Sequence, residues 1–194
     1  VYKRQTYNNG GLSLYGAVDV LNKASFGTNN TADTEDNQIT ITAAVNYDCG
    51  FAKSYLGVHW FDNAKAVGSS SFGGDWGRMG NFKKDDGTAV YSGFGDANGW
   101  SVMLGVDIPV GNGKVKTTLG YLDASSDNED FSASADVDQD LKRFMVGAGY
   151  EYYLSKRTTV YMGAGYLQDS IDTAKGNSYD PSWVQVNCGL KHKF

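Results

Sequence analysis

The sequence predicts an all-β fold, a transmembrane antiparallel up-and-down β-barrel, from three observations. Apolar residues recur at every second position in one run after another, which is the periodicity of strands with two different faces. The chain has 25 Gly and 13 Tyr but only 2 Pro, a composition typical of many strands and turns. Its last alternating run continues to Phe194, as a closed barrel in a bilayer allows because every strand edge is paired.

Hydropathy agrees with this fold class. No window approaches eighteen consecutive apolar residues, so the sequence predicts no transmembrane helix. The negative mean hydropathy is compatible with a membrane barrel, because only alternate residues of each strand meet lipid.

The alternation predicts about eight strands. Gly, Asn, Asp and Pro mark tight turns at residues 8–11, 48–50 and 109–113, and polar segments separate the other runs. Long and short connections alternate strictly, which places the short turns at one end of the barrel and the long loops, led by residues 64–97, at the other. The predicted strands cover residues 12–20, 38–47, 53–60, 100–108, 114–121, 143–152, 159–166 and 183–194.

Aromatic residues on the apolar parity of the strands predict the two membrane interfaces. Barrels in membranes carry girdles of aromatic side chains at both interfaces. Five aromatics lie beside the long loops and predict one girdle: Trp60, Trp100, Tyr121, Phe144 and Tyr166. Four lie near the short turns and predict the second: Tyr47, Tyr150, Tyr152 and Phe194.

The opposite parity predicts the lining of the barrel interior. It is rich in Gly, which leaves little side-chain volume to fill a closed core and therefore favours a wide, water-filled lumen. Charged groups on such a wall stay hydrated and bias which ions pass. Any single one is also compatible with a wetted wall position of no special role. The candidate pore-lining residues are Lys53, His59, Asp107, Lys116, Arg143, Glu151 and Lys191.

A search for other chemistry argues against an enzyme. His59 and His192 have no carboxylate or cysteine at triad or ligand spacing, so the sequence predicts no catalytic residue, no metal site and no cofactor. Residues 111–114 lack the first Gly and the Ser or Thr of a phosphate-binding loop. Asp136, Asp138 and Asp140 have the spacing of a calcium loop without its Gly, and a solvated acidic loop is the preferred interpretation. The net charge of −5 argues against nucleic acid as a partner.

The C-terminal residues resemble a known family. The run Tyr-Tyr-Leu-Ser-Lys-Arg-Thr-Thr-Val-Tyr at 152–161 and the ending Gly-Leu-Lys-His-Lys-Phe at 189–194 resemble the general trimeric porins of Gram-negative bacteria, most of all those of betaproteobacteria. The resemblance implies a passive channel for small hydrophilic solutes and ions in the bacterial outer membrane, and a homotrimer when full length. It also implies contact with outer-membrane lipid and lipopolysaccharide, and assembly by the barrel-assembly machinery through a signal that ends at Phe194.

The resemblance also implies that the chain is part of a larger barrel. General porins have sixteen strands, so we expect residues 10–194 to form the C-terminal half of such a barrel, with the constriction loop in the other half. Residues 1–9 are expected to be a turn remnant, or non-native at their start.

Two alternatives stay open on the sequence alone. A complete eight-stranded barrel of the small outer-membrane type would have an adhesion or structural role, and eight is an allowed strand number. Its interior positions should be bulky and charge-paired, whereas this chain has Gly there. A soluble β-sandwich with a binding role is the third and least favoured possibility.

Overall fold

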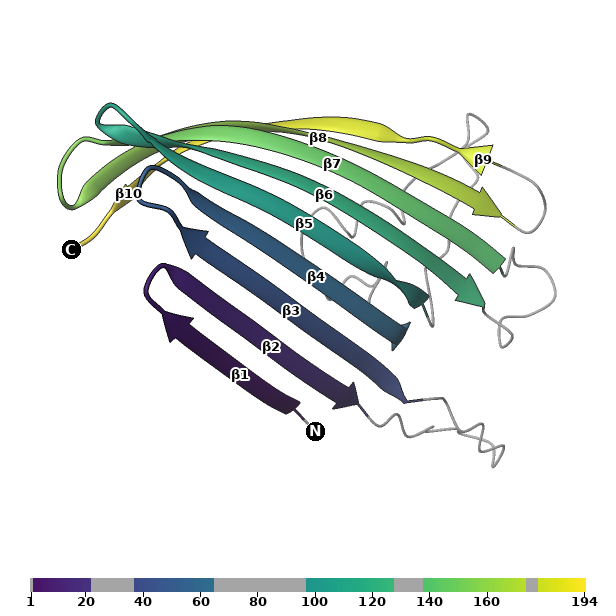
Figure 1. Cartoon of the computed structure of the whole chain (residues 1–194). Coiled ribbons are helices and arrows are strands. Elements are labelled where there is room, and N and C mark those ends of the chain that lie inside the picture. The colour runs from purple at the N-terminus through teal and green to yellow at the C-terminus, as the bar shows by residue number, and fades with distance from the viewer. Residues whose placement is uncertain (1, 22–36, 65–96, 128–137, 174–177) are drawn as a thin grey trace.

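The protein is one curved antiparallel β-sheet in the computed structural model (Figure 1). The structure describes residues 2–21, 37–64, 97–127, 138–173 and 178–194. None of these residues forms a helix long and apolar enough to cross a membrane. The strands are β1 (Tyr2–Asn9), β2 (Leu12–Leu21), β3 (Gln38–Asp48), β4 (Lys53–Ala64), β5 (Ala97–Val110), β6 (Gly113–Asp127), β7 (Asp138–Tyr153), β8 (Thr158–Thr173), β9 (Ser178–Tyr179) and β10 (Ser182–His192).

The strand order confirms the predicted up-and-down topology. Neighbours in the sheet follow the chain from β1 to β8 and then β10, every pair is antiparallel, and the short β9 pairs with β8. In the described part of the chain β1 and β10 do not pair with each other, so the sheet is open at both edges.

The N-terminal residues are a correction to the expected turn remnant. Tyr2–Asn9 forms the full strand β1 and pairs with β2 along its whole length, which makes nine long strands where about eight were predicted. The side chains of β1 are all exposed and mostly polar on both faces. Without an apolar alternation the strand carried no periodic signal, and only its partner β2 identifies it.

Strands β5 to β8 are longer than the sequence indicated. Strands β5 to β8 have 14, 15, 16 and 16 residues, more than the roughly 9–11 that a tilted strand needs to cross a bilayer. The extra residues of β6, from Leu122 to Asp127, are largely small and polar. Hydrogen bonding between strands continues there although the hydrophobic pattern has ended.

The tight turns depend on residues with positive φ. Gly10, Gly50 and Gly111 have φ values of 56°, 86° and 59°, in the left-handed region that glycine adopts without steric cost. They close the β1–β2, β3–β4 and β5–β6 hairpins. A side chain at these positions would strain the turns that set the register of each hairpin.

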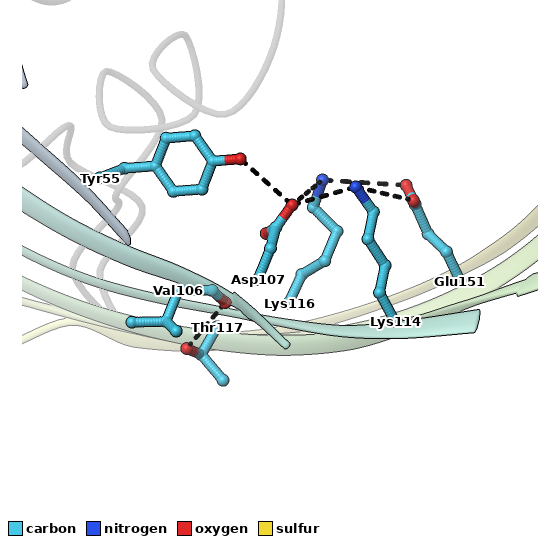
Figure 2. Close-up of polar contacts among 7 residues, drawn as sticks. All are labelled: Tyr55, Val106, Asp107, Lys114, Lys116, Thr117 and Glu151. Atoms are coloured by element: carbon cyan, nitrogen blue, oxygen red, sulfur yellow. Dashed lines mark hydrogen bonds and ion pairs between the residues drawn. The ribbon is translucent and has the colours of Figure 1, made fainter. Parts of the chain in front are cut away.

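The two faces of the sheet have opposite character. Residues that lie opposite each other on neighbouring strands share a face, as Leu104 does with both Leu56 and Leu119. The outer face carries exposed apolar side chains on all the long strands from β2 to β10, with Leu104 at 47% exposure and Val186 at 69%. The inner face, defined as the one that carries Tyr55 and Asp107, is the concave side in the view of Figure 2.

Apolar side chains on the inner face are buried near the long connections. Phe61, Ala124, Leu141 and Ile171 are each at most 5% exposed and form the core of the described chain. Cross-strand pairing places Ala124 opposite Leu141, and Leu141 opposite Ile171, so three of them form one row across β6, β7 and β8. Apolar burial on the inner face is therefore confined to this end, where the row lies beside the buried Arg143 and Asp169.

Candidate functional site

A charged cluster spans four strands of the inner face near the short turns (Figure 2). Lys114 on β6 places its Nζ 3.0 Å from Oδ2 of Asp107 on β5 and 3.6 Å from Oε2 of Glu151 on β7. Lys116 places its Nζ 3.5 Å from Oδ2 of Asp107 and 3.9 Å from Oε1 of Glu151. The Tyr55 hydroxyl on β4 donates to Oδ2 of Asp107 over 3.3 Å. We call these five residues the charge ladder.

The strand register builds the charge ladder. Asp107 lies opposite Lys53 on one side and opposite Lys116 on the other. Lys114 lies opposite Glu151, and it shares a face with Lys116 because the two are separated by one residue. Alternating carboxylates and ammonium groups thus follow from pairing alone.

The charge ladder is electrically balanced and partly exposed. The Lys114 and Lys116 side chains are 28% and 46% exposed and that of Glu151 is 32% exposed, whereas that of Asp107 is 11% exposed. Ion pairs with this much exposure contribute little to stability, in the range of about 0–1 kcal/mol each. Two cations facing two anions therefore form a polar surface on the inner face and contribute little to holding the strands together.

A groove with a glycine floor lies beside the ladder. It has a volume of about 340 Å³, with Lys116 and Thr118 on one side and Gln185 and Asn187 on the other. Gly149 faces Gly163 across the pair β7 and β8, and a Cβ on Gly149 would lie 2.9 Å from the Met162 carbonyl oxygen. The bare backbone therefore keeps this part of the inner face open. The floor consists of Gly147, Gly149, Gly163 and Gly165.

Arg143 faces inward as predicted, but the structure removes it from the water-exposed wall. Its Nε donates to Oδ1 of Asp169 over 2.6 Å, and its Nη2 donates to Oδ2 over 2.7 Å, so the two side chains form a bidentate pair. Its side chain is 6% exposed, and that of Asp169 is 0% exposed. The guanidinium also lies 5.4 Å from the ring centroid of Trp183. This buried ion pair links β7 to β8, and the charge of Arg143 is balanced by that of Asp169.

The other candidates differ in what surrounds them. Lys53 lies with its Nζ 5.7 Å from the ring centroid of Tyr55, next to the ladder. Lys191 is separate from the ladder and lines a cavity near the β7–β8 turn together with Glu151. His59 packs edge-on against Phe61 at 5.6 Å, and its Nε2 is buried with no hydrogen-bond partner among the described residues. The structure thus brings Asp107, Lys116 and Glu151 together and leaves His59 apart.

Three residues of these clusters were absent from the sequence-based candidates. Lys114 shares the parity of Lys116, and Tyr55 shares that of Lys53, so the alternation could have included both. Asp169 lies opposite Arg143 in the register but beyond residue 166, where the predicted strand ended. Only the extended pairing of β8 identifies this partner.

The predicted interface aromatics form rows on the outer face. Beside the long connections, Trp60 lies opposite Trp100, the Trp100 and Tyr121 rings are 5.6 Å apart, and Tyr121 lies opposite Phe144. Tyr166 continues the outer face on β8, opposite Val146.

The aromatics at the other end lie beside the short turns. The Tyr150 and Tyr152 rings are 6.4 Å apart, and the Tyr150 hydroxyl donates to the Val110 carbonyl oxygen over 2.9 Å. Tyr47 lies opposite Leu12 near the β3–β4 turn. Phe194 follows β10, fully exposed and edge-on to His192 with ring centroids 4.9 Å apart.

Metal chemistry has no visible basis in the part of the chain that the structure describes. No three or more His, Cys, Asp or Glu side chains gather there in a group that could hold a metal ion. Of the three aspartates with calcium-loop spacing, Asp136 lies outside the described residues.

These features together define a class of protein. An antiparallel up-and-down sheet with an apolar outer face, aromatic rows at both ends and a charged inner face is a segment of the wall of an outer-membrane β-barrel. The sequence matches the family model described as Gram-negative porin over residues 2–172, and the chain belongs to this family. The family lies in the bacterial outer membrane and is known for channels rather than enzymes.

Solved structures support the same fold. The anion-selective porin from Comamonas acidovorans is 23% identical and superposes with a TM-score of 0.60 over 98% of this chain and 48% of that chain. OmpT, an outer membrane protein of Vibrio cholerae in its in-vitro folded form, is 14% identical with a TM-score of 0.61 over 100% of this chain and 49% of that one. The chain therefore spans about half the length of both proteins. No curated protein sequence matches it significantly.

Proposed function

We propose that the complete protein is a passive diffusion channel for small hydrophilic solutes and ions across the bacterial outer membrane. The observation that carries this proposal is the contrast between the two faces of one sheet. The outer face exposes apolar side chains that need lipid, while the inner face exposes the charge ladder and a glycine-floored groove that need water. The pore-lining residues in this proposal are Lys53, Asp107, Lys114, Lys116, Glu151 and Lys191.

The chain supplies the C-terminal half of this channel in our proposal. An open sheet in lipid would leave the backbone N–H and C=O groups at both edges without partners, which costs several kcal/mol for each group. In our proposal further strands pair with β1 and β10, which is supported by the coverage of 48% of the Comamonas porin. The proposed barrel segment begins at β1 instead of residue 10.

A complete small barrel with an adhesion or structural role fits these observations less well. Such barrels have closed sheets, an even number of strands and interiors filled by side chains. The described chain has nine long strands, open edges and a floor of four glycines.

We also propose the assembly partners of this channel. The outer aromatic rows would lie at the two membrane interfaces, where they meet phospholipid and lipopolysaccharide. Phe194, whose side chain is fully exposed beside His192, would act as the signal for the barrel-assembly machinery. The full-length protein would be a homotrimer, as general porins are.

Conductance of the full-length protein in a planar lipid bilayer tests the proposal. A porin should produce stepwise increases in current that scale with salt concentration. Insertion without any increase in current would exclude a diffusion channel and favour a structural barrel.

Neutralising one sign of the charge ladder should shift ion preference. In Asp107→Asn/Glu151→Gln the two lysines lose their partners and should attract anions, whereas Lys114→Gln/Lys116→Gln should favour cations. A unit charge 4 Å from an ion in water changes its local concentration by about fivefold, which is an upper limit for each pair in a wide pore. Reversal potentials across a KCl gradient measure the shift, and equal values for both variants would show that these residues do not line the ion path.

A further inference from the structure

A second inner-face cavity lies at the short-turn end of the sheet, between the β7–β8 turn and the C-terminal strand. It has a volume of about 560 Å³, within the range of pockets that hold small molecules. Four cations line it: Lys156 and Arg157 from the turn, and Lys191 and Lys193 from the last residues of the chain. We call these four residues the basic mouth.

The backbone around the basic mouth is held in place by local hydrogen bonds. The Ser155 hydroxyl oxygen accepts from the N–H groups of Arg157 and Thr158 over 3.1 and 3.0 Å. The N–H of Lys193 donates to the Arg157 carbonyl oxygen over 2.9 Å, which fixes the end of the chain to the turn. The backbone segments that carry the two pairs of cations are therefore held next to each other before any ligand arrives.

The positive charge of the basic mouth is not balanced by its own lining. Glu151 is the only carboxylate among the described residues that line the cavity, against four cations. Its two oxygens are already within 4 Å of Lys114 and Lys116, so it belongs to the charge ladder. Among the described residues no carboxylate lies at ion-pair distance from Lys156, Arg157, Lys191 or Lys193.

We propose that the basic mouth is a binding site for small multivalent oxyanions, such as solutes that carry phosphate or several carboxylates. A guanidinium presents paired N–H donors that match two oxygens of such a group, and the three ammonium groups supply further charge without a fixed geometry. This inference rests on the proposed channel function, because it places the site at the pore entrance on the short-turn side. Bound anions would then meet the cations of the charge ladder next along the wall.

Calorimetric titration of the full-length porin with inorganic pyrophosphate tests the site without depending on conduction. In zwitterionic detergent and 0.1 M salt, wild type should bind pyrophosphate at one site per chain. Lys156→Gln/Arg157→Gln should weaken binding by about tenfold, since each of the two removed unit charges accounts for up to about fivefold. Lys191→Gln/Lys193→Gln should have the same effect, and since all four side chains are exposed, neither pair is expected to disturb folding.

Lys142→Gln is the matched control, because this exposed cation lies on the outer face of β7, at the end of the strand far from the basic mouth. It should leave pyrophosphate affinity unchanged. Binding should also weaken strongly at 1 M salt, where the Debye length falls from about 10 Å to about 3 Å. Equal affinity in wild type and both double variants, or no binding at 0.1 M salt, would overturn the site.

Bilayer recordings with pyrophosphate separate this inference from the channel proposal. Added to one compartment at a time, pyrophosphate should reduce chloride current at lower concentration from one side than from the other, and both double variants should lose this asymmetry. Conduction with no asymmetry in wild type would refute an entrance site and leave the channel intact. Absence of conduction would refute the channel, while the titration still decides whether the anion binds.

Discussion

Replacing Arg143 by methionine is expected to destabilise the folded barrel by about 3–5 kcal/mol, the usual cost of removing one partner of a buried ion pair. The carboxylate of Asp169 is completely buried and accepts two hydrogen bonds from the guanidinium, so in the variant it would be left buried without these donors. Unfolding of the full-length porin in lipid vesicles by guanidinium chloride, followed by tryptophan fluorescence, measures the loss of stability.

Two further variants show whether the loss comes from the ion pair. Lys142→Gln changes the neighbouring exposed cation and should alter the free energy of unfolding by no more than about 0.5 kcal/mol. The double variant Arg143→Met/Asp169→Leu removes both charges and should recover most of the stability, because apolar replacements of a buried pair are often neutral. If Arg143→Met unfolds like Lys142→Gln, the pair is solvated in the membrane and our description of this region is wrong.

The part of the fold that the sequence predicts well is the division into two faces. Residues such as Leu104 and Val146 could be assigned to the outer face from parity alone, because a strand offers only two directions to its side chains. The register then brings Asp107, Lys116 and Glu151 into one cluster, and all three were candidates from the alternation. Where lipid lies on one side and water on the other, period two is a strong constraint.

The burial of a side chain and its hydrogen-bond partners could not be predicted in the same way. Parity places Arg143 on the inner face, but it does not report that the side chain is buried or that Asp169 accepts its hydrogen bonds. Strand β1 is mostly polar, and at the ends of β6 and β8 near the long connections the apolar residues, such as Ala124 and Ile171, lie on the inner face. The outward apolar alternation therefore stops there, and these segments are strands because a neighbouring strand pairs with them. Such pairing depends on residues distant in sequence, which local patterns do not report.

The substitutions Leu104→Arg and Met103→Arg should have sharply different effects, and comparing them tests the assignment of the two faces. Leu104 lies at the middle of the outer run of β5, between Trp100 and Ile108, and is 47% exposed, while Met103 on the inner face is 48% exposed. The two differ almost only in the face they occupy. A charge near the bilayer midplane costs about 2–4 kcal/mol, so Leu104→Arg should lower the free energy of unfolding by that amount.

Met103→Arg should instead leave stability nearly unchanged and alter the current. Its cross-strand neighbours on the inner face are Gly57 and Gly120, so an arginine there has room to extend into water. The added charge should raise the local anion concentration by up to about fivefold and so shift the reversal potential toward anion selectivity. Leu104→Arg should not produce this shift. Guanidinium unfolding in vesicles and reversal potentials in a KCl gradient give the two readouts. A reversed result, with Met103→Arg destabilised and Leu104→Arg altered only in selectivity, would mean that the charge ladder faces lipid, and the channel proposal would fall with it.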